Sequence, residues 1–167
     1  AAYAACFVQG LSHEDIMRGM QTFPGLAHRM QWLGDVNGVQ YVNDSKATNA
    51  DATEKALKTY DKIHWIIGGV PKEGGIEPLQ HYFHKITHAY LIGDAAEAFA
   101  KTLGDTVPHT MCGTLERAFA AASGNAKRGE AVVLSPACAS FDQFKNFEHR
   151  GEVFMELVKG LGDVATA

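Results

Sequence analysis

The chain has 167 residues, which is enough for one domain with a well-buried core. Its composition, 46% hydrophobic and 20% charged, is that of an ordinary globular protein. The formal net charge is −4 and neither sign clusters, which argues against nucleic-acid binding because phosphate contacts need a basic stripe. No apolar run approaches the roughly 20 residues that cross a bilayer, and no basic leader is visible. We therefore expect a cytoplasmic protein with neither a membrane nor a nucleic acid as partner.

The cysteines and histidines are not spaced as metal ligands. Cys6, Cys112 and Cys138 contain no CxxC pair, and His81 and His84 have no cysteine pair nearby. An odd number of unpaired cysteines is typical of reduced thiols in the cytosol. We expect no metal site built by this chain alone.

Residues 1–25 are predicted to be a tail rather than part of the main domain. The segment AAYAACFVQG is typical of the end of a helix, and Ser12 and Asp15 can cap a second helix that runs to about Gln21. Pro24-Gly25 then breaks this helix. We interpret the segment as the end of a preceding domain or a linker, with the main domain at 26–167.

The rest of the chain alternates between strand-like and helical patterns. Residues 30–36 and 39–42 flank Asn37-Gly38, a dipeptide that suits a type I′ hairpin turn. Continuous apolar runs predict later strands at 63–67, 89–92 and 131–134, and helices are expected at 51–59, 78–84, 94–103, 114–125 and from about Asp142. This order predicts an α/β, Rossmann-like fold: a mostly parallel sheet with helices on both faces and an N-terminal hairpin.

Three loops that follow predicted strands are polar or glycine-rich, as expected for binding loops at the carboxyl ends of a parallel sheet. They are NDSKATN at 43–49, GGVPKEGG at 68–75 and SPACASFDQFKNFEHRG at 135–151. Turns and caps explain many of these residues, but Lys46 and Thr48 add a cation and a hydroxyl that capping does not require. A helix N-terminus in the third loop, where Ser140 and Gln143 can form a capping box, would favour a carboxylate or phosphate. The residues therefore predict a pocket for a small anionic ligand.

Some motifs are missing. Neither GxxxxGK[ST] nor a GxGxxG that opens a helix after a strand occurs, which disfavours a self-contained P-loop enzyme and an oxidoreductase domain. Cys138 lies between two alanines without an accompanying base, so a structural role is favoured over a nucleophilic one.

FPGLAHRM, NDSKATN, GGVPKEGG and SPACASFDQFKNFEHRG occur in the order and at the separations of a known family. The chain resembles the C-terminal domain of the Mur ligases, in particular the UDP-N-acetylmuramoyl-L-alanine:D-glutamate ligases. The resemblance implies an ATP-dependent acid–D-amino-acid ligase of peptidoglycan synthesis, in which a preceding N-terminal domain and a central ATPase domain hold the sugar substrate, the P-loop and Mg²⁺. Residues 1–25 would then end the central domain, and the fragment alone would be inactive.

The resemblance also implies site residues. Thr48, Lys72, Ser140, Phe141 and Phe147 would bind D-glutamate. His28, Arg29 and Asp44 would contact ATP, and Lys46 would be a catalytic charge that organises the closed site. Two alternatives remain open: a free-standing Rossmann-like binding domain for a small anionic ligand, and a Mur-type ligase for another amino acid, against which NDSKATN argues.

Overall fold

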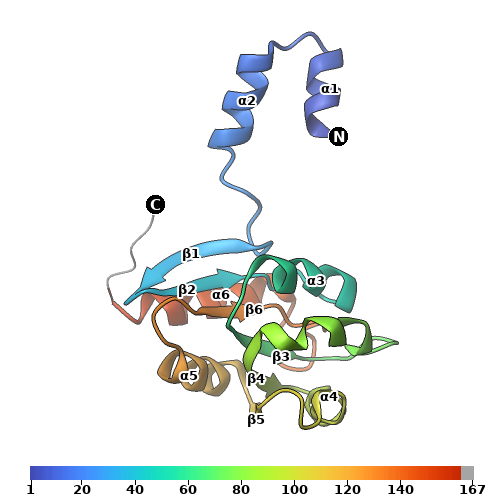
Figure 1. Cartoon of the computed structure of the whole chain (residues 1–167), viewed down its shortest axis with the longest axis vertical. Helices are drawn as coiled ribbons and strands as arrows, with labels where there is room; N and C mark the ends of the chain where they lie inside the picture. Colours follow the sequence, from blue (N-terminus) through green and yellow to red (C-terminus); the bar gives the residue numbers. More distant parts are fainter. Residues whose placement is uncertain (163–167) are drawn as a thin grey trace.

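A computed structural model of the chain describes residues 1–162 and contains a six-stranded mixed sheet (Figure 1). The strand order is β1-β2-β6-β3-β4-β5; β1 and β2 are antiparallel and all other neighbours are parallel. The strands are β1 Gln31–Val36, β2 Val39–Asn43, β3 Ile63–Gly68, β4 Ile86–Ile92, β5 His109–Gly113 and β6 Ala131–Leu134. The predicted α/β fold with its N-terminal hairpin is confirmed.

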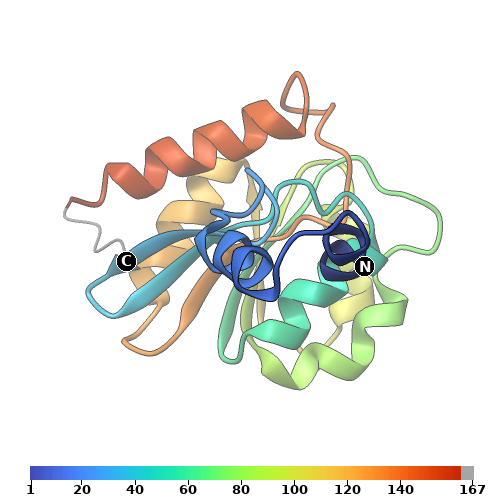
Figure 2. The ribbon, with the colours of Figure 1, turned by 90° about the horizontal axis from the view of Figure 1, so that it is seen from above.

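Helices cover both faces of the sheet, as Figure 2 shows with the sheet seen along its layers. On one face, α3 (Ala50–Thr59), the 3₁₀ helix η1 (Glu77–Lys85) and α4 (Ala96–Leu103) bury residues against one side of the strands. On the other face, α5 (Leu115–Asn125) and α6 (Phe147–Lys159) do the same. Because β3 is buried on both faces, its sequence is a continuous apolar run with Trp65, Ile66 and Ile67 fully buried.

The hairpin has the turn that its sequence predicts. Asn37 and Gly38 both adopt positive φ, 55° and 84°, and Val36 pairs with Val39 across the turn. Two consecutive residues of positive φ are the requirement of a type I′ turn, which matches the right-handed twist of the flanking strands.

Several local predictions were wrong. The last helix begins at Phe147 rather than near Asp142, because Asn146 caps it through an Oδ1 that accepts the His149 N–H, and Ser140 with Gln143 forms only a backbone turn. The segment predicted as a helix at 78–84 is a 3₁₀ helix, and α4 begins after Ala95 without a side-chain cap. Strand β5 was not predicted, because it is a short edge strand whose residues are mostly exposed and lack an apolar run.

Two helices precede the sheet and stand away from it in Figure 1. α1 (Ala2–Val8) contains no buried residue, and α2 (His13–Thr22) buries only Ile16. Ser12 caps α2 as predicted, since its Oγ accepts the Asp15 N–H at 3.1 Å. Within residues 1–162, none of the helices is both long and apolar enough to cross a membrane.

Candidate functional site

The three polar loops extend from adjacent strands. β6 lies between β2 and β3, so residues 43–49, 68–75 and 135–146 all emerge at the same end of the sheet. All three strands are parallel to one another, which places their carboxyl ends together. This edge is where ligands bind in open α/β sheets.

Backbone hydrogen bonds join the second and third loops. Gly68 N–H donates to Pro136 O at 3.0 Å, and Val70 and Ala139 exchange two N–H···O bonds of 2.9 and 3.1 Å. The glycine-rich loop is thereby attached to the segment that leads to Ser140.

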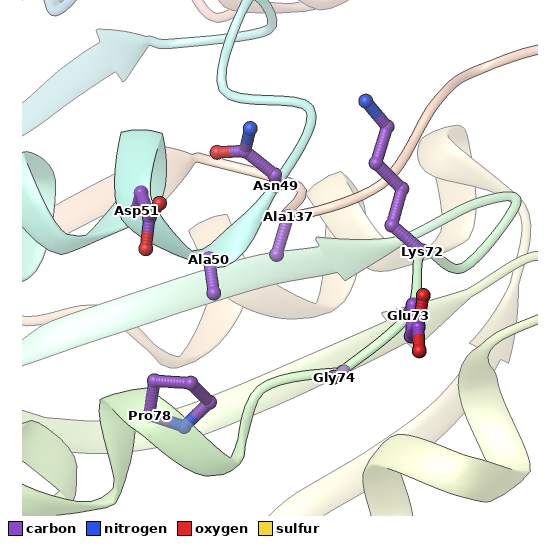
Figure 3. Close-up of a pocket in the computed structure, with 9 residues that line it drawn as sticks. Asn49, Ala50, Asp51, Lys72, Glu73, Gly74, Pro78 and Ala137 are labelled. Atoms are coloured by element: carbon purple, nitrogen blue, oxygen red, sulfur yellow. The ribbon is translucent and has the colours of Figure 1, made fainter.

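A pocket of about 480 Å³ lies between the second loop and the start of α3. Figure 3 shows Lys72 and Glu73 on the loop, with Asn49 and Asp51 across the pocket at the beginning of α3. Ala137 of the third loop completes the lining together with Gly74, Gly75, Pro78 and Ala50. We call this space the Lys72 pocket; its one ammonium and two carboxylates suit a small ligand that carries both signs of charge.

Lys46, Phe147 and His28 form a second group, the Lys46 cluster. The Lys46 Nζ lies 3.6 Å from the centroid of the Phe147 ring, within the range of a cation–π contact. The His28 ring meets the same phenyl ring edge-on at 6.0 Å, and the His28 Nδ1 lies 3.0 Å from Asn43 Nδ2. The Lys46 N–H donates to His28 O at 2.9 Å, so the three residues are fixed relative to one another.

Asp44 is buried beside this cluster and both of its carboxylate oxygens accept hydrogen bonds. Met30 N–H donates to Oδ1 at 3.0 Å and Ser135 Oγ donates to Oδ2 at 2.8 Å. Burial raises the pKa of Asp44, although the two hydrogen bonds and the charge of Arg29 act in the opposite direction. The carboxylate therefore connects the residue before β1 to the residue after β6, while Arg29 is exposed to solvent.

The structure places the remaining predicted residues differently. Thr48 is half-buried and immediately precedes Asn49 of the Lys72 pocket. Ser140 is buried, and within residues 1–162 its Oγ makes no hydrogen bond. Phe141 is 72% exposed, so its ring is open to solvent. Of the nine predicted residues, Lys72 lines the Lys72 pocket, and Lys46, Phe147 and His28 form the Lys46 cluster with Asp44 beside it. Thr48, Arg29, Ser140 and Phe141 belong to neither group, so the predicted residues do not form one continuous pocket.

Cys138 is fully buried at the base of the third loop. Burial raises its pKa to about 12, which leaves the thiol protonated and unreactive at neutral pH. The geometry agrees with the structural role predicted for it.

Arg150, Ser45 and Asn49 belong to the site but were not singled out from the sequence. Arg150 is fully buried and donates to both the first and the third loops. A signal existed: Phe147, Arg150, Gly151 and Phe154 follow the i, i+3, i+4, i+7 spacing, so a charged residue falls on the buried stripe of a helix. A charge at such a position needs specific partners.

The fold and the position of the loops define an α/β domain with a candidate ligand site at the carboxyl ends of adjacent parallel strands. Residues 28–138 match the family described as "Mur ligase, glutamate ligase domain". The chain belongs to this family.

Known proteins agree with this assignment. The UDP-N-acetylmuramoylalanine–D-glutamate ligase of Rhizobium johnstonii is 56% identical over 98% of the chain, which spans 36% of that relative's length. Among solved structures, a UDP-N-acetylmuramate–alanine ligase from Thermotoga maritima has a TM-score of 0.68 at 13% identity, covering 95% of this chain and 36% of that one. A bifunctional folylpolyglutamate synthase/dihydrofolate synthase from Yersinia pestis, complexed with AMPPNP and a manganese ion, has a TM-score of 0.61 at 19% identity, with 89% of this chain and 35% of that chain covered.

Proposed function

We propose that this chain is the C-terminal, amino-acid-binding part of a cytoplasmic ATP-dependent ligase that adds D-glutamate to UDP-MurNAc-L-alanine. Residues 1–25 would then be the end of a central ATPase domain. The C-terminal domain would comprise residues 26–167, of which the structure describes those up to 162. The observation that supports this most is the Lys72 pocket, which presents one ammonium and two carboxylates at the carboxyl end of the sheet. Glutamate also carries one ammonium and two carboxylates, so Lys72 can pair with one of its carboxylates while Glu73 and Asp51 can accept hydrogen bonds from its ammonium. The similarity to the D-glutamate ligase of Rhizobium johnstonii extends across the whole site.

The proposed roles follow from what each side chain offers. Lys72 is exposed at the rim of the pocket and supplies a charged donor to a carboxylate. Thr48 precedes the pocket-lining Asn49, and Ser140 has a hydroxyl without an internal partner among residues 1–162, so we assign both hydroxyls as donors to the amino acid. We assign Phe141 and the first turn of α6 at Phe147 to the rim that closes over the amino acid.

ATP, with Mg²⁺ bound, would transfer its γ-phosphoryl group to the carboxylate of the first substrate, which gives an acyl phosphate and ADP. The amine of D-glutamate would then attack this acyl phosphate, forming the amide and releasing phosphate and a proton. Within residues 1–162 no group of three metal-ligating side chains occurs, so Mg²⁺ is assigned to the preceding domain. We assign ATP contacts to His28, Arg29 and Asp44. Arg29 is exposed and suits a phosphate, while Asp44 accepts the Met30 N–H and the His28 ring is held by the Asn43 side chain. Lys46, held against the Phe147 ring, contributes a positive charge that organises the closed site.

The first test is a titration of the isotope-labelled chain with D-glutamate and then L-glutamate, followed by backbone amide shifts. We expect saturable shifts at Thr48, Lys72 and residues 140–147, larger for the D form. Equal shifts with both forms, or shifts elsewhere, would favour a general anion-binding domain instead. If the isolated chain shows no response, the same titration of the intact ligase decides the matter.

A lysine substitution sharpens this test. Lys72→Ala in the intact ligase should raise the KM for D-glutamate about tenfold to a hundredfold, because a hydrogen bond to a charged group contributes about 1.5–3 kcal/mol. Lys127→Ala is the matched control, since this exposed lysine lies beyond α5 at the opposite end of the sheet. Unchanged kinetics of the Lys72 variant would contradict its assignment.

A further inference from the structure

Arg150 is the most unusual buried residue of the site. Its side chain is fully buried in α6, on the stripe that also carries Gly151 and Phe154. Within residues 1–162 no carboxylate forms an ion pair with it, and Asp142 acts on the guanidinium only at longer range. Burial of a charge without a counter-ion is costly unless neutral groups accept its hydrogen bonds.

The guanidinium uses these hydrogen bonds to connect two loops. Its Nε donates to Ser45 Oγ at 3.0 Å, and one terminal nitrogen donates to Ser45 O at 2.8 Å and to Cys138 O at 3.1 Å. Ser45 Oγ in turn donates to Phe147 O at 2.8 Å. Ser45 lies between Asp44 and Lys46, so Arg150 contacts the backbone of the first loop at its centre.

The second loop also approaches this side chain. A Cβ placed on Gly69 would lie 3.3 Å from the other terminal nitrogen, which has no hydrogen-bond partner within the described residues. All three polar loops therefore converge on one planar group. A planar fork of fixed N–H donors orders several acceptors at once, which a flexible ammonium does less well.

We propose that Arg150 is a positioning residue that holds the NDSKATN loop and the segment leading to Ser140 in one arrangement, so that Thr48 and Ser140 are presented together to the amino acid. The inference rests on the proposed function for the identity of the ligand, but not for the ordering of the loops. A residue that served stability alone would be replaced without loss by a well-packed apolar side chain, because buried charges contribute weakly to stability.

The test compares Arg150→Met, Arg150→Lys and Leu103→Ala in the intact ligase. Leu103 is fully buried at the end of α4, away from the three loops, so its variant is destabilised without a change at the site. Arg150→Met should raise the KM for D-glutamate about tenfold or more, since two loops lose charged hydrogen bonds, while the KM for the sugar substrate stays near the wild-type value. Arg150→Lys should recover part of this loss, and Leu103→Ala should show none of it.

Hydrogen exchange of the chain supplies a second measurement that needs no ligand. The amides of Lys46 and Ala139, which donate to His28 O and Val70 O, should exchange faster in Arg150→Met while those of β3 keep their protection. Uniform loss of protection, or a KM and exchange pattern equal to those of Leu103→Ala, would overturn the positioning role. If the wild-type ligase does not use D-glutamate, the proposed function fails, and exchange at the two loops still decides the role of Arg150.

Discussion

Gly68 ends β3 at the point where the second loop begins, and its replacement by alanine should be severely destabilising. Its φ is +129°, and a Cβ built there would lie 1.9 Å from Ile92 O on the neighbouring strand β4. Real Cβ atoms do not approach a carbonyl oxygen so closely, so the two strands would have to separate. That separation also weakens the bond from Gly69 N–H to Ile92 O, which is 3.1 Å long.

The expected loss has two sources. Backbone strain at such a φ costs about 1–3 kcal/mol for a residue other than glycine. A displaced strand additionally loses a hydrogen bond of about 1 kcal/mol and the packing around it. We therefore expect Gly68→Ala to lower the free energy of unfolding by about 3 kcal/mol or more, a large share of the roughly 5–15 kcal/mol typical of a domain.

Gly74, in the same loop, is the matched control. Its φ is +85°, but a Cβ there would meet nothing within 4 Å. Gly74→Ala should lower the free energy of unfolding only by the conformational cost of a positive φ, about 1 kcal/mol. The lower entropy of the unfolded alanine variant offsets part of this cost. Urea unfolding followed by tryptophan fluorescence, to which the buried Trp65 and the partly exposed Trp32 contribute, measures the stability of both variants. If the two variants have equal stability, steric contact at Gly68 is not what makes glycine necessary.

Three further predictions concern buried polar groups. Tyr90→Phe should lower the free energy of unfolding by about 1–3 kcal/mol, because it leaves the buried His64 Nδ1, 2.9 Å from the hydroxyl, without its partner. Tyr82→Phe, which removes a half-exposed hydroxyl, should lower the free energy of unfolding by less in the same urea experiment. Burial acts to raise the pKa of Glu130, but hydrogen bonds from the Lys127 N–H and His64 outweigh it and the pKa is lowered. The stabilisation that Glu130 contributes should therefore be complete at pH values above its ordinary pKa of 4.5, and it should disappear as the pH falls through the lower pKa of the folded state. If a Glu130→Gln variant and the wild type lose stability identically on acidification, the lowered pKa is contradicted. Cys138, whose pKa burial raises to about 12, should resist maleimide labelling in the native chain and react only in urea; rapid native labelling would contradict its burial.

The sequence by itself determined the local elements that depend on nearby residues. Asn37-Gly38 specified the hairpin because few residues adopt two consecutive positive φ values, and the continuous apolar runs at 63–67 and 131–134 specified strands buried on both faces. Its motifs also marked the three loops that the fold brings to one end of the sheet. Strand β5 was not predicted, because an edge strand at the surface needs no apolar run.

Only the tertiary structure decided how the loops meet. Insertion of β6 between β2 and β3 brings Ser45 beside Arg150, 105 residues away in sequence, and no local pattern encodes that strand order. The start of α6 was likewise decided by Asn146, which caps the helix by accepting the His149 N–H. Ser140 and Gln143 offered an equally good local signal for an earlier start. Local propensity specifies elements within a few residues, but the partners of a buried charge are determined by packing across the whole sheet. The helical spacing could mark Arg150 as buried, but only the fold shows which loops it joins.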